Sequence, residues 1–433
     1  MERTIFLSTP YGLQIHDLLY SDLLPLLTEK SDLRIIVLTF SHKKEFLRDQ
    51  LEIQNGRVTF EDLFSSSLKY RRHLIDWIQH LRSSKWVSRS KFLTLSTGPL
   101  SSSFYTERRY RDLFKQYKPS LVITATPGQN PIDRFLLHES NRSKIPTLSI
   151  VESWDKLVTK GPMAVRPHFL AVWNEMMKEE AVRIHHFDPE KVFVVGTTRF
   201  DSYLNGKGQL LSRKAFFQKM GLDSRKKLIT LTTAPAPSVG DHNFILKILL
   251  EALERDRFSF PAQIVCRLHP NDDYHRYEEF QGIPHLHFDI PNRDLRPEYW
   301  TPSKKDFLHL ATLITHTDVL VNIASTMTIE ACIADVPIVN LGFSTSEPER
   351  FAHQIGVVHH QRHYRHVLER NGVRLAYKES DLVESINTYL RNPSLDREGR
   401  RNIADNLTYK LDGKSSERIS KLILTLSNLQ VYP

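Results

Sequence analysis

The stretch Asp318–Gly342, DVLVNIASTMTIEACIADVPIVNLG, decides the fold of this chain. It begins with a short apolar run, Val319–Val321, which has the length and β-branching of a buried strand. Two small hydroxyl residues, Ser325 and Thr326, come next, followed by a helical segment. A second apolar run, Pro337–Leu341, closes the stretch as another strand. Strand, hydroxyl-bearing turn, helix and strand form a βαβ unit, which is the building block of a parallel sheet.

The turn at Ser325 is placed where a parallel sheet binds ligands. Ligands of such sheets lie beyond the carboxyl ends of the strands. The first turn of a helix beginning near Ser325 offers unbonded backbone N–H groups and a positive dipole end to an anion such as a phosphate. A plain helix-capping role for Ser325 explains the same residue type equally well.

The alternation of strand and helix extends over the rest of the chain. Strands are expected at 5–8, 33–39, 58–60, 121–124, 147–151, 169–173 and 192–195, and again at 228–232, 263–268, 319–321 and 337–341. Helical patterns separate most of them, including one long helix expected from Leu13 to Thr28. Such alternation is typical of α/β proteins with doubly wound parallel sheets. The predicted fold class is therefore two facing Rossmann-like domains with a cleft between them.

The predicted domain boundaries follow a polar linker, Asn205–Ser212. Residues 1–206 form an N-terminal domain for an acceptor substrate, and residues 207–412 form a C-terminal domain for a nucleotide donor. Residues 413–433 add a closing C-terminal helix. The length of 433 residues suits two domains of about 200 residues each.

Composition limits the class of protein. A hydrophobic fraction of 40% and a charged fraction of 25% are those of a globular protein. The two cysteines, Cys266 and Cys332, fall in apolar runs and predict buried thiols rather than a disulfide scaffold or a zinc site. No apolar run reaches the roughly 18 residues of a membrane span. The first residues lack the apolar core of a signal peptide, so a cytoplasmic location is expected.

One region, 69–118, is strongly basic: it holds 12 Lys and Arg against 3 Asp and Glu, with aromatic residues between them. A pair of solvated helices accounts for this excess of charge. Docking on the anionic inner face of a membrane that holds a lipid acceptor is the second interpretation. No nucleic-acid motif accompanies the charge, so nucleic acid is not an expected partner.

In the C-terminal half, two predicted strand ends meet at the same rim. One carries Arg267, His269 and Pro270, and the other carries Asn322, Ser325 and Thr326. Arg267 and His269 can donate hydrogen bonds to phosphate oxygens or to a base carbonyl. Glu330, one turn along the helix, can accept from a ribose hydroxyl, as acidic residues do in dinucleotide sites. A surface carboxylate is the alternative for Glu330.

These residues carry a resemblance to a known class. The chain resembles the GT-B fold glycosyltransferases, in the branch that includes the CDP-glycerol glycerophosphotransferases and some bacterial sialyltransferases. Arg267–Pro270 resembles the His-Pro motif of those families, and Ser325-Thr326 with Glu330 resembles their phosphate motif. Asp412–Ile419 is similar to the closing "DG…S.R" helix of the glycerophosphotransferases. Two N-terminal segments, Glu152–Leu157 and Val195–Asp201, show a weaker similarity.

The resemblance implies a transferase that needs a general base for an acceptor hydroxyl. His16 is one candidate, because a histidine of near-neutral pKa suits proton abstraction. Asp17, Glu152 and Asp155 are the others.

Further contacts to a phosphate or to the acceptor are predicted for Lys160, with Gly161 beside it, and for Gly12 in the turn after the first strand. The resemblance also implies independence of metal ions and a cytidine or uridine nucleotide. No Walker A loop, GxSxG elbow or HExxH motif is present.

Four functions therefore remain open. The leading one is transfer of a glycosyl group from a nucleotide-activated donor to a hydroxyl of a glycan or lipid-linked acceptor, in the synthesis of surface polysaccharide or glycoconjugate. No separate cofactor is expected, since the nucleotide sugar is the substrate. The alternatives are a CDP-glycerol-type polyol-phosphate transferase, a non-hydrolysing nucleotide-sugar 2-epimerase, and a non-catalytic nucleotide-binding protein.

Overall fold

The computed structural model describes residues 3–29, 31–51, 56–64, 106–128, 131–161, 163–205, 209–234, 243–291, 300–343, 359 and 361–429. The chain divides into two compact units. Unit 1 comprises Met1–Asp201 and Asp412–Pro433, and unit 2 comprises Ser202–Leu411. The boundaries expected from sequence lie at 206 and 412, and the structure groups the closing helix with unit 1.

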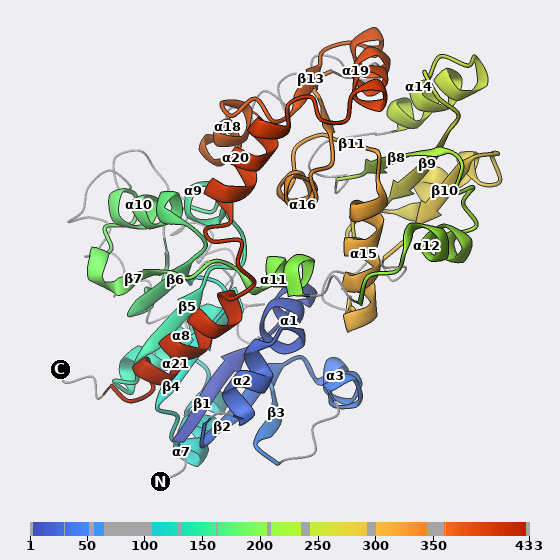
Figure 1. The fold of residues 1–433 in the computed structure, drawn as a ribbon. Helices are drawn as coiled ribbons and strands as arrows, with labels where there is room; N and C mark the ends of the chain where they lie inside the picture. Colours follow the sequence, from blue (N-terminus) through green and yellow to red (C-terminus); the bar gives the residue numbers. More distant parts are fainter. Residues whose placement is uncertain are drawn as a thin grey trace. The chain divides into compact units, whose positions relative to one another are not determined.

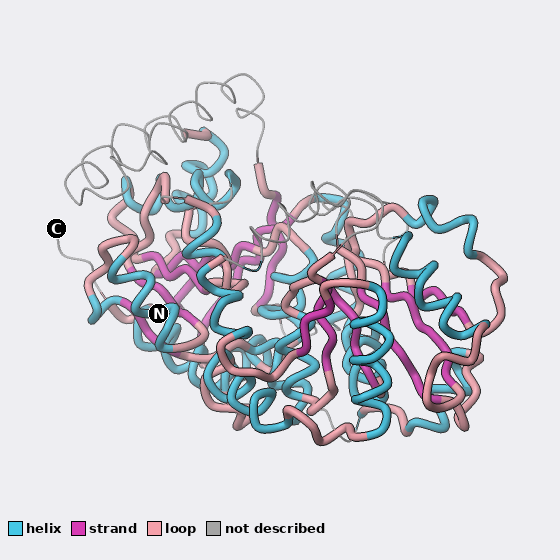
Figure 2. Tube along the Cα trace, turned by 90° about the horizontal axis from the view of Figure 1, so that it is seen from above, coloured by secondary structure: helices cyan, strands magenta, loops and turns pink. Residues whose placement is uncertain are grey.

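Unit 1 contains a sheet of seven strands in the order β3-β2-β1-β4-β5-β6-β7, all parallel. The strands are β1 Arg3–Ser8, β2 Leu33–Thr39, β3 Val58–Asp62, β4 Leu121–Thr124, β5 Thr147–Ile150, β6 Phe169–Val172 and β7 Val192–Val194. The central strands are buried along their whole length because helices cover both faces (Figure 2). This explains their nearly continuous runs of apolar residues.

The helices of unit 1 include one irregular segment. They are α1 Gly12–Ile15, η1 His16–Tyr20, α2 Leu23–Glu29, η2 Ser41–Lys43, α3 Lys44–Leu51, α7 Arg108–Tyr117, α8 Pro131–Arg142, α9 Lys156–Thr159, α10 Glu175–Arg183, η3 Pro189–Lys191, α11 Thr198–Asn205, which continues into unit 2, and α21 Ser415–Leu426. The single helix predicted from Leu13 to Thr28 is wrong. It contains a π-helical turn, η1, and breaks at Ser21, which is extended. Pro25 lies in the first turn of α2, where its missing N–H costs nothing.

Unit 2 contains a sheet of six parallel strands in the order β10-β9-β8-β11-β12-β13. They are β8 Lys227–Thr232, β9 Ala262–Arg267, β10 Leu286–Asp289, β11 Val319–Asn322, β12 Ile338–Leu341 and β13 Arg374–Ala376. Its helices are α12 Arg213–Met220, α14 Asn243–Glu254, η5 Tyr274–Phe280, α15 Lys304–His316, α16 Met327–Ile333, α18 Arg362–Leu368, α19 Glu379–Arg391 and α20 Arg397–Leu407 (Figure 1).

The predicted fold class, α/β with two doubly wound parallel sheets, is confirmed. The strands that sequence analysis missed are β10 and β13, one at each end of the unit 2 sheet. Both are short, and β10 includes His287 and Asp289. Edge strands have one side without a neighbour and tolerate polar residues, so their apolar pattern is weak.

Helix α21 returns the chain to unit 1, where it packs beside α2 (Figure 1). Asp201, on α11, accepts hydrogen bonds from the backbone N–H groups of Ser415 at 3.2 Å and Ser416 at 2.9 Å. Arg418 donates to the Val195 carbonyl at 2.9 Å and pairs with Asp412. Gly196 has a φ of 80°, and a Cβ there would lie 2.6 Å from Ser415 Oγ. The "DG…S.R" motif is thus the attachment of this helix to unit 1.

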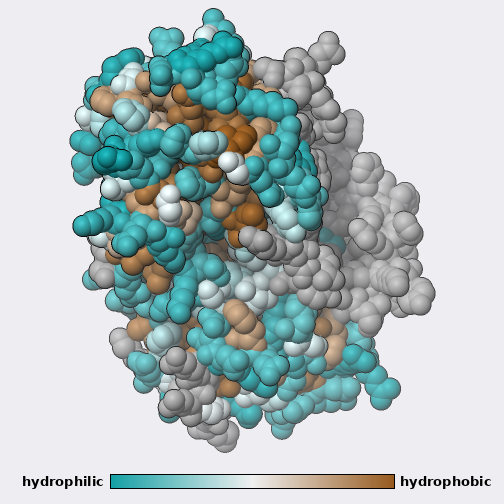
Figure 3. Space-filling view, turned by 90° about the vertical axis from the view of Figure 1, so that its right-hand side faces the viewer, coloured by the Kyte–Doolittle hydropathy of each residue, from teal (hydrophilic) through white to brown (hydrophobic). Residues whose placement is uncertain are grey.

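No helix in the described part of the chain is both long and apolar enough to cross a bilayer. The face drawn in Figure 3 is largely hydrophilic, with apolar patches between the polar residues. The basic region 69–118 falls mainly on residues outside those described, apart from 106–118 around α7, so membrane docking through it stays a prediction.

Candidate functional site

The carboxyl edge of the unit 2 sheet carries the predicted donor residues. Strands β8 and β11 are neighbours in the sheet although two strands, β9 and β10, lie between them in the chain. The order of the strands reverses here, so the topological switch point lies between β8 and β11. Thr233 follows β8, His269 follows β9, and Ser325 follows β11. Parallel strands end at a common edge, which brings these three turns to one side of the sheet.

His269 is held as a neutral hydrogen-bond donor. Its backbone N–H donates to Thr233 Oγ1 at 2.9 Å, and its Nδ1 accepts from the Asn271 N–H at 3.0 Å. Burial lowers the pKa of His269 to about 4, and the nearby Arg267 lowers it too, against the opposing effect of Asp272. A neutral ring that accepts at Nδ1 carries its proton on Nε2. Its Nε2–H is then available to donate to an anionic ligand.

The carboxylates after His269 are structural. Asp272 is buried and accepts from Thr233 Oγ1 at 2.6 Å and from the Tyr277 hydroxyl at 2.8 Å. Asp273 caps the 3₁₀ helix η5 by accepting from the His275 N–H at 2.9 Å. Pro270 lies in the turn closed by the Asp272 N–H and the His269 carbonyl at 2.8 Å.

Arg267 forms an ion pair within unit 2. Its Nη1 donates to Asp289 Oδ2 at 2.8 Å, and His309 Nε2 lies 3.2 Å from the same oxygen. Burial alone would raise the pKa of Asp289, but His309 and Arg267 together hold it below its ordinary value. Direct contact of Arg267 with a nucleotide stays a prediction, and its observed partner is a carboxylate.

Asn322 belongs to a buried polar network behind the Ser325 turn. Its amide donates to Ser325 Oγ at 3.2 Å and to Thr328 Oγ1 at 3.1 Å. Asn340 donates to Asn322 Oδ1 at 2.7 Å and to the Tyr364 hydroxyl at 2.7 Å. Asn322 is almost fully buried, so its observed role is to orient the turn rather than to reach solvent.

Ser325 and Thr326 form the entry to α16. Ser325 Oγ accepts from the Met327 N–H at 3.2 Å, but Ser325 lies one residue before the N-cap, Thr326, whose side chain makes no capping hydrogen bond. Thr326 is the residue that precedes the helix, and both hydroxyl residues are partly exposed. They stay candidates for contact with a phosphate.

Glu330 is not the surface carboxylate that a helix position suggests. Its residue exposure is 6%, and its Oε2 accepts a hydrogen bond of 2.5 Å from the hydroxyl of Tyr203 on α11. Both residues belong to unit 2. Nothing in the sequence around residue 203 indicates this pairing, because 127 residues separate the partners.

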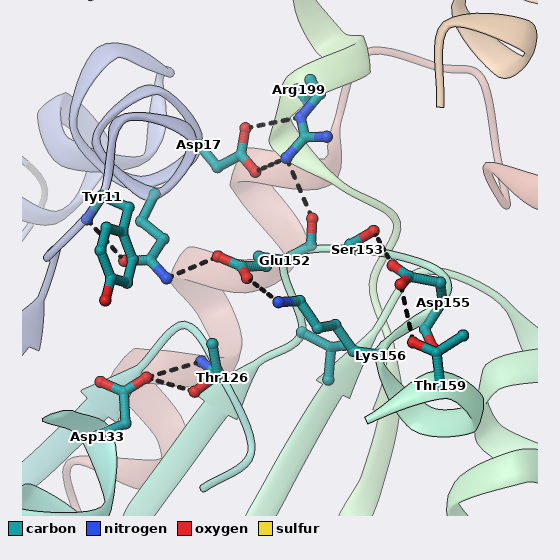
Figure 4. Close-up of polar contacts among 12 residues, drawn as sticks. Tyr11, Asp17, Thr126, Asp133, Glu152, Ser153, Asp155, Lys156, Thr159 and Arg199 are labelled. Carbon is teal, nitrogen blue, oxygen red and sulfur yellow. Dashed lines mark hydrogen bonds and ion pairs between the residues drawn. The ribbon is translucent and has the colours of Figure 1, made fainter. Parts of the chain in front are cut away.

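In unit 1, His16 and Asp17 lie in the π-helical turn η1 after β1, and both are buried. His16 is therefore not on an exposed helix face. His16 Nδ1 lies 2.8 Å from Asp17 Oδ1. Arg199 donates to both oxygens of Asp17, at 3.2 and 2.7 Å (Figure 4). Burial raises the pKa of Asp17, but Arg199 and His16 outweigh it and hold this pKa below its ordinary value.

Glu152 follows β5 and joins the same cluster. Its Oε2 accepts from Gln14 Nε2 at 2.6 Å, and its Oε1 lies 2.7 Å from Lys156 Nζ. Arg199 Nη2 also donates to the Glu152 carbonyl at 3.1 Å, so Arg199 bridges Glu152 and Asp17 (Figure 4). The structure thus brings together three of the four predicted bases: His16, Asp17 and Glu152.

Asp155 points to other partners. Its carboxylate accepts from Ser153 Oγ and from Thr159 Oγ1, the latter at 2.9 Å, which ties down the short helix α9 (Figure 4). Lys160 ends α9 and is exposed. Gly12 is buried as the first residue of α1. Its carbonyl accepts a hydrogen bond from the backbone N–H of His16.

Asp133 is a buried carboxylate that sequence analysis missed. It lies at the switch point of unit 1, between the ends of β1 and β4. It accepts from Ser8 Oγ at 2.9 Å and from Thr126 N–H and Oγ1 at 3.1 and 2.6 Å. Burial raises the pKa of Asp133 to about 7, the charge of Glu152 adds to this rise, and the hydrogen bonds oppose it.

Four residues of the unit 1 cluster had no role in the sequence prediction: Gln14, Asp133, Lys156 and Arg199. Lys156 and Arg199 lie within the two N-terminal segments that carry the weaker resemblance. Position shortly after a predicted strand is the one signal they share with the predicted bases. Among the described residues, no group of three or more His, Cys, Asp or Glu side chains is placed to hold a metal ion.

No protein-family model and no curated protein matches the chain. Solved structures do match it. The UDP-GlcNAc 2-epimerase from Methanocaldococcus jannaschii has a TM-score of 0.57 at 18% identity, covering 98% of this chain and 100% of the other. The wall teichoic acid polymerase TagF gives 0.57 at 12% identity, over 100% and 90%. A glycosyltransferase from Rickettsia africae gives 0.51 at 11%, over 98% and 99%. At these identities the likeness shows the fold, which is the GT-B fold.

Proposed function

We propose that the chain is a GT-B enzyme that transfers a sugar from a nucleotide-activated donor to a hydroxyl of a glycan or lipid-linked acceptor, in the synthesis of surface polysaccharide or glycoconjugate. The observation that carries the proposal is the edge of the unit 2 sheet. A neutral His269 donor follows β9, and the hydroxyl turn Ser325-Thr326 follows β11, on either side of the end of β8. Hydrogen-bond donors at the topological switch point of a parallel sheet are well placed to bind the phosphates of a nucleotide.

Each residue of this edge has a role in the proposal. His269 donates through Nε2–H to a phosphate oxygen or to the base. The hydroxyl groups of Ser325 and Thr326 donate hydrogen bonds to the diphosphate. The amide of Asn322 donates to Ser325 Oγ and so orients this turn. Glu330 accepts from a ribose hydroxyl. The resemblance favours a uridine or cytidine nucleotide for these roles. Some solved structures of the same fold hold such nucleotides, among them an epimerase in complex with UDP-GlcNAc and UDP.

His16 is the proposed general base. Asp17 is held ionised by Arg199, so it accepts the Nδ1–H of His16 and leaves Nε2 as the basic nitrogen. In the reaction, the acceptor O–H gives its proton to this nitrogen, the acceptor oxygen bonds to the anomeric carbon, and the bond from that carbon to the phosphate oxygen breaks. The nucleotide leaves with the electron pair. No metal ion is required in this scheme.

The first test is thermal stability against UDP, GDP, CDP, CMP and ADP. A ligand present at 100 times its Kd adds about 2.7 kcal/mol to the folded state. The stabilisation by one nucleotide should disappear in His269→Ala and persist in the control His275→Ala, because His275 is an exposed histidine that pairs with Glu278 on the surface. Absence of stabilisation by every nucleotide would contradict the proposal.

The second candidate is a nucleotide-sugar 2-epimerase. The observation in its favour is that the M. jannaschii epimerase aligns with almost the whole of both chains. Product analysis separates the two. A transferase releases free nucleotide only when an acceptor is present, whereas an epimerase interconverts two UDP-sugars without acceptor. Stabilisation by CDP or CMP alone would instead favour the polyol-phosphate transferase.

A further inference from the structure

The turn that carries His269 is held by a side chain of the neighbouring strand. Strand β9 ends at Arg267, and Leu268 still bonds to the sheet, because its N–H donates to the Asp289 carbonyl at 3.0 Å. The next N–H, that of His269, donates to a side chain instead of a strand carbonyl: it bonds to Thr233 Oγ1 at 2.9 Å. The Thr233 hydroxyl therefore extends the hydrogen bonding of the sheet by one residue, into the turn.

Thr233 is itself fixed in place. It follows directly after β8, it is 7% exposed, and its N–H donates to the Arg267 carbonyl on β9 at 3.1 Å. Because a backbone N–H can only donate, Thr233 Oγ1 is the acceptor of the bond from His269, and its own proton is left for another partner. That partner is Asp272 Oδ2 at 2.6 Å. The hydroxyl group thus both accepts and donates, and both bonds lead to the same turn, 269–272.

Asp272 closes this turn from its other end. Its N–H donates to the His269 carbonyl at 2.8 Å, and its Oδ2 also accepts from the Tyr277 hydroxyl at 2.8 Å. Within the turn, the Asn271 N–H donates to His269 Nδ1 at 3.0 Å and so fixes the ring. The Thr233 hydroxyl therefore links the end of β8 to a turn whose backbone orients the imidazole.

We propose that Thr233 is a positioning residue for nucleotide binding: its hydroxyl group holds the His269 turn so that Nε2–H is directed at the ligand. The inference rests on the proposed function, in which His269 donates to the nucleotide. A hydrogen bond weakens steeply as its angle departs from linear, so a ring that moves with its turn binds less well than a fixed one. Without the hydroxyl group, the bond between the Asp272 N–H and the His269 carbonyl keeps the turn closed, but the turn loses this bond to β8.

The experiment measures the binding of UDP, CDP, GDP and ADP by isothermal titration calorimetry. Thr233→Val keeps the shape of the side chain and removes the hydroxyl group, whereas Thr233→Ser keeps the hydroxyl group. Thr230→Val is the matched control, because Thr230 lies on the same strand, is fully buried, and its hydroxyl lies 2.7 Å from Thr317 Oγ1, outside the turn. Each variant is also made in the His269→Ala background.

The natural chain, Thr233→Ser and Thr230→Val should bind one of these nucleotides with similar affinity. Thr233→Val should bind it roughly tenfold more weakly, which is the effect of losing one well-formed hydrogen bond. In the His269→Ala background, the same substitution should have little further effect, because residues that act through one another are not additive. A valine that only loosened the fold would weaken binding equally in both backgrounds.

The inference is overturned by an unchanged affinity in Thr233→Val, which would show that the turn holds His269 without the hydroxyl group. An equal loss in the two backgrounds, or an equal loss in Thr233→Ser, would overturn it as well. Thermal unfolding checks that each variant folds, and Thr233→Ala removes the same hydroxyl group if the valine variant does not fold.

The outcome also separates this inference from the proposed function. If the natural chain binds none of the four nucleotides, the proposed function fails and this inference with it. If the natural chain and Thr233→Val bind the same nucleotide equally well, only this inference fails.

Discussion

Arg199 donates hydrogen bonds to both carboxylate oxygens of Asp17, although 182 residues separate the two in the chain. The pair is buried, and the same guanidinium reaches the Glu152 carbonyl. A guanidinium can donate two parallel hydrogen bonds to the two oxygens of one carboxylate, and the single ammonium group of a lysine cannot reproduce this geometry. Arg199 therefore organises the cluster that contains His16, the proposed base.

Replacing Arg199 tests this organisation. Arg199→Met leaves the Asp17 carboxylate buried without its main cation, which typically costs about 3 to 5 kcal/mol of unfolding free energy. Urea denaturation measures the loss. The control is Arg225→Met, because Arg225 pairs with Asp223 in the solvent and should cause no measurable change. A loss in Arg199→Met no larger than in the control would show that the Asp17 pair does not stabilise unit 1.

The protonation of Asp133 should appear in the pH dependence of stability. Its pKa rises from 3.8 to about 7 on folding. Since the folded state binds this proton more tightly than the unfolded state, the stabilisation is complete below pH 3.8 and is lost as the pH rises to about 7. Across that window, the unfolding free energy should fall by roughly 2 to 4 kcal/mol more in the natural chain than in Asp133→Asn.

Asp133→Asn is a suitable comparison because an amide can keep the same partners. Its oxygen can accept from Thr126, and its NH₂ group can donate to Ser8 Oγ. Denaturation curves from pH 4 to 8 give the difference between the two proteins. Parallel pH profiles would contradict a raised pKa for Asp133.

The attachment of helix α21 depends on Asp201. Asp201→Ala removes the acceptor for the N–H groups of Ser415 and Ser416, and loss of such a cap costs about 1 kcal/mol, at most roughly 2. The amides of 415–426 should exchange hydrogen faster than in the natural chain. Asp405→Ala, at an exposed position of α20, is the control and should leave this exchange unchanged. Equal exchange in all three proteins would show that packing against α2 alone holds the helix.

His269 should bind a nucleotide without a change of charge between pH 5.5 and 8. Burial lowers its pKa to about 4, so the ring stays neutral over this range. A sugar nucleotide is the right ligand, since its diphosphate stays ionised throughout. The ratio of its affinities for the natural chain and for His269→Gln should be constant with pH. A severalfold change of this ratio near pH 6.5, the ordinary pKa of histidine, would indicate a protonated donor instead.

The sequence by itself determined the fold class and most of the strands. Continuous runs of apolar residues indicate strands that are buried on both faces of a parallel sheet. This pattern is local, so it can be recognised from neighbouring residues in the sequence. Strand β2 Leu33–Thr39, for example, has the bounds expected. The turn after each strand end is likewise local, and it identified His269, Ser325 and Glu152 as residues of the sheet edges.

The tertiary structure alone decided the partners of those residues. Arg199 with Asp17, Tyr203 with Glu330 and Asp201 with Ser416 are each joined across more than a hundred residues of chain. No local pattern encodes such pairs, because a side chain's partner depends on how helices and strands pack. Burial follows from the same packing, and it sets the charge state: it makes His269 neutral and raises the pKa of Asp133. Residue types therefore predicted where chemistry is possible, while packing decided which groups are charged, paired and oriented for it.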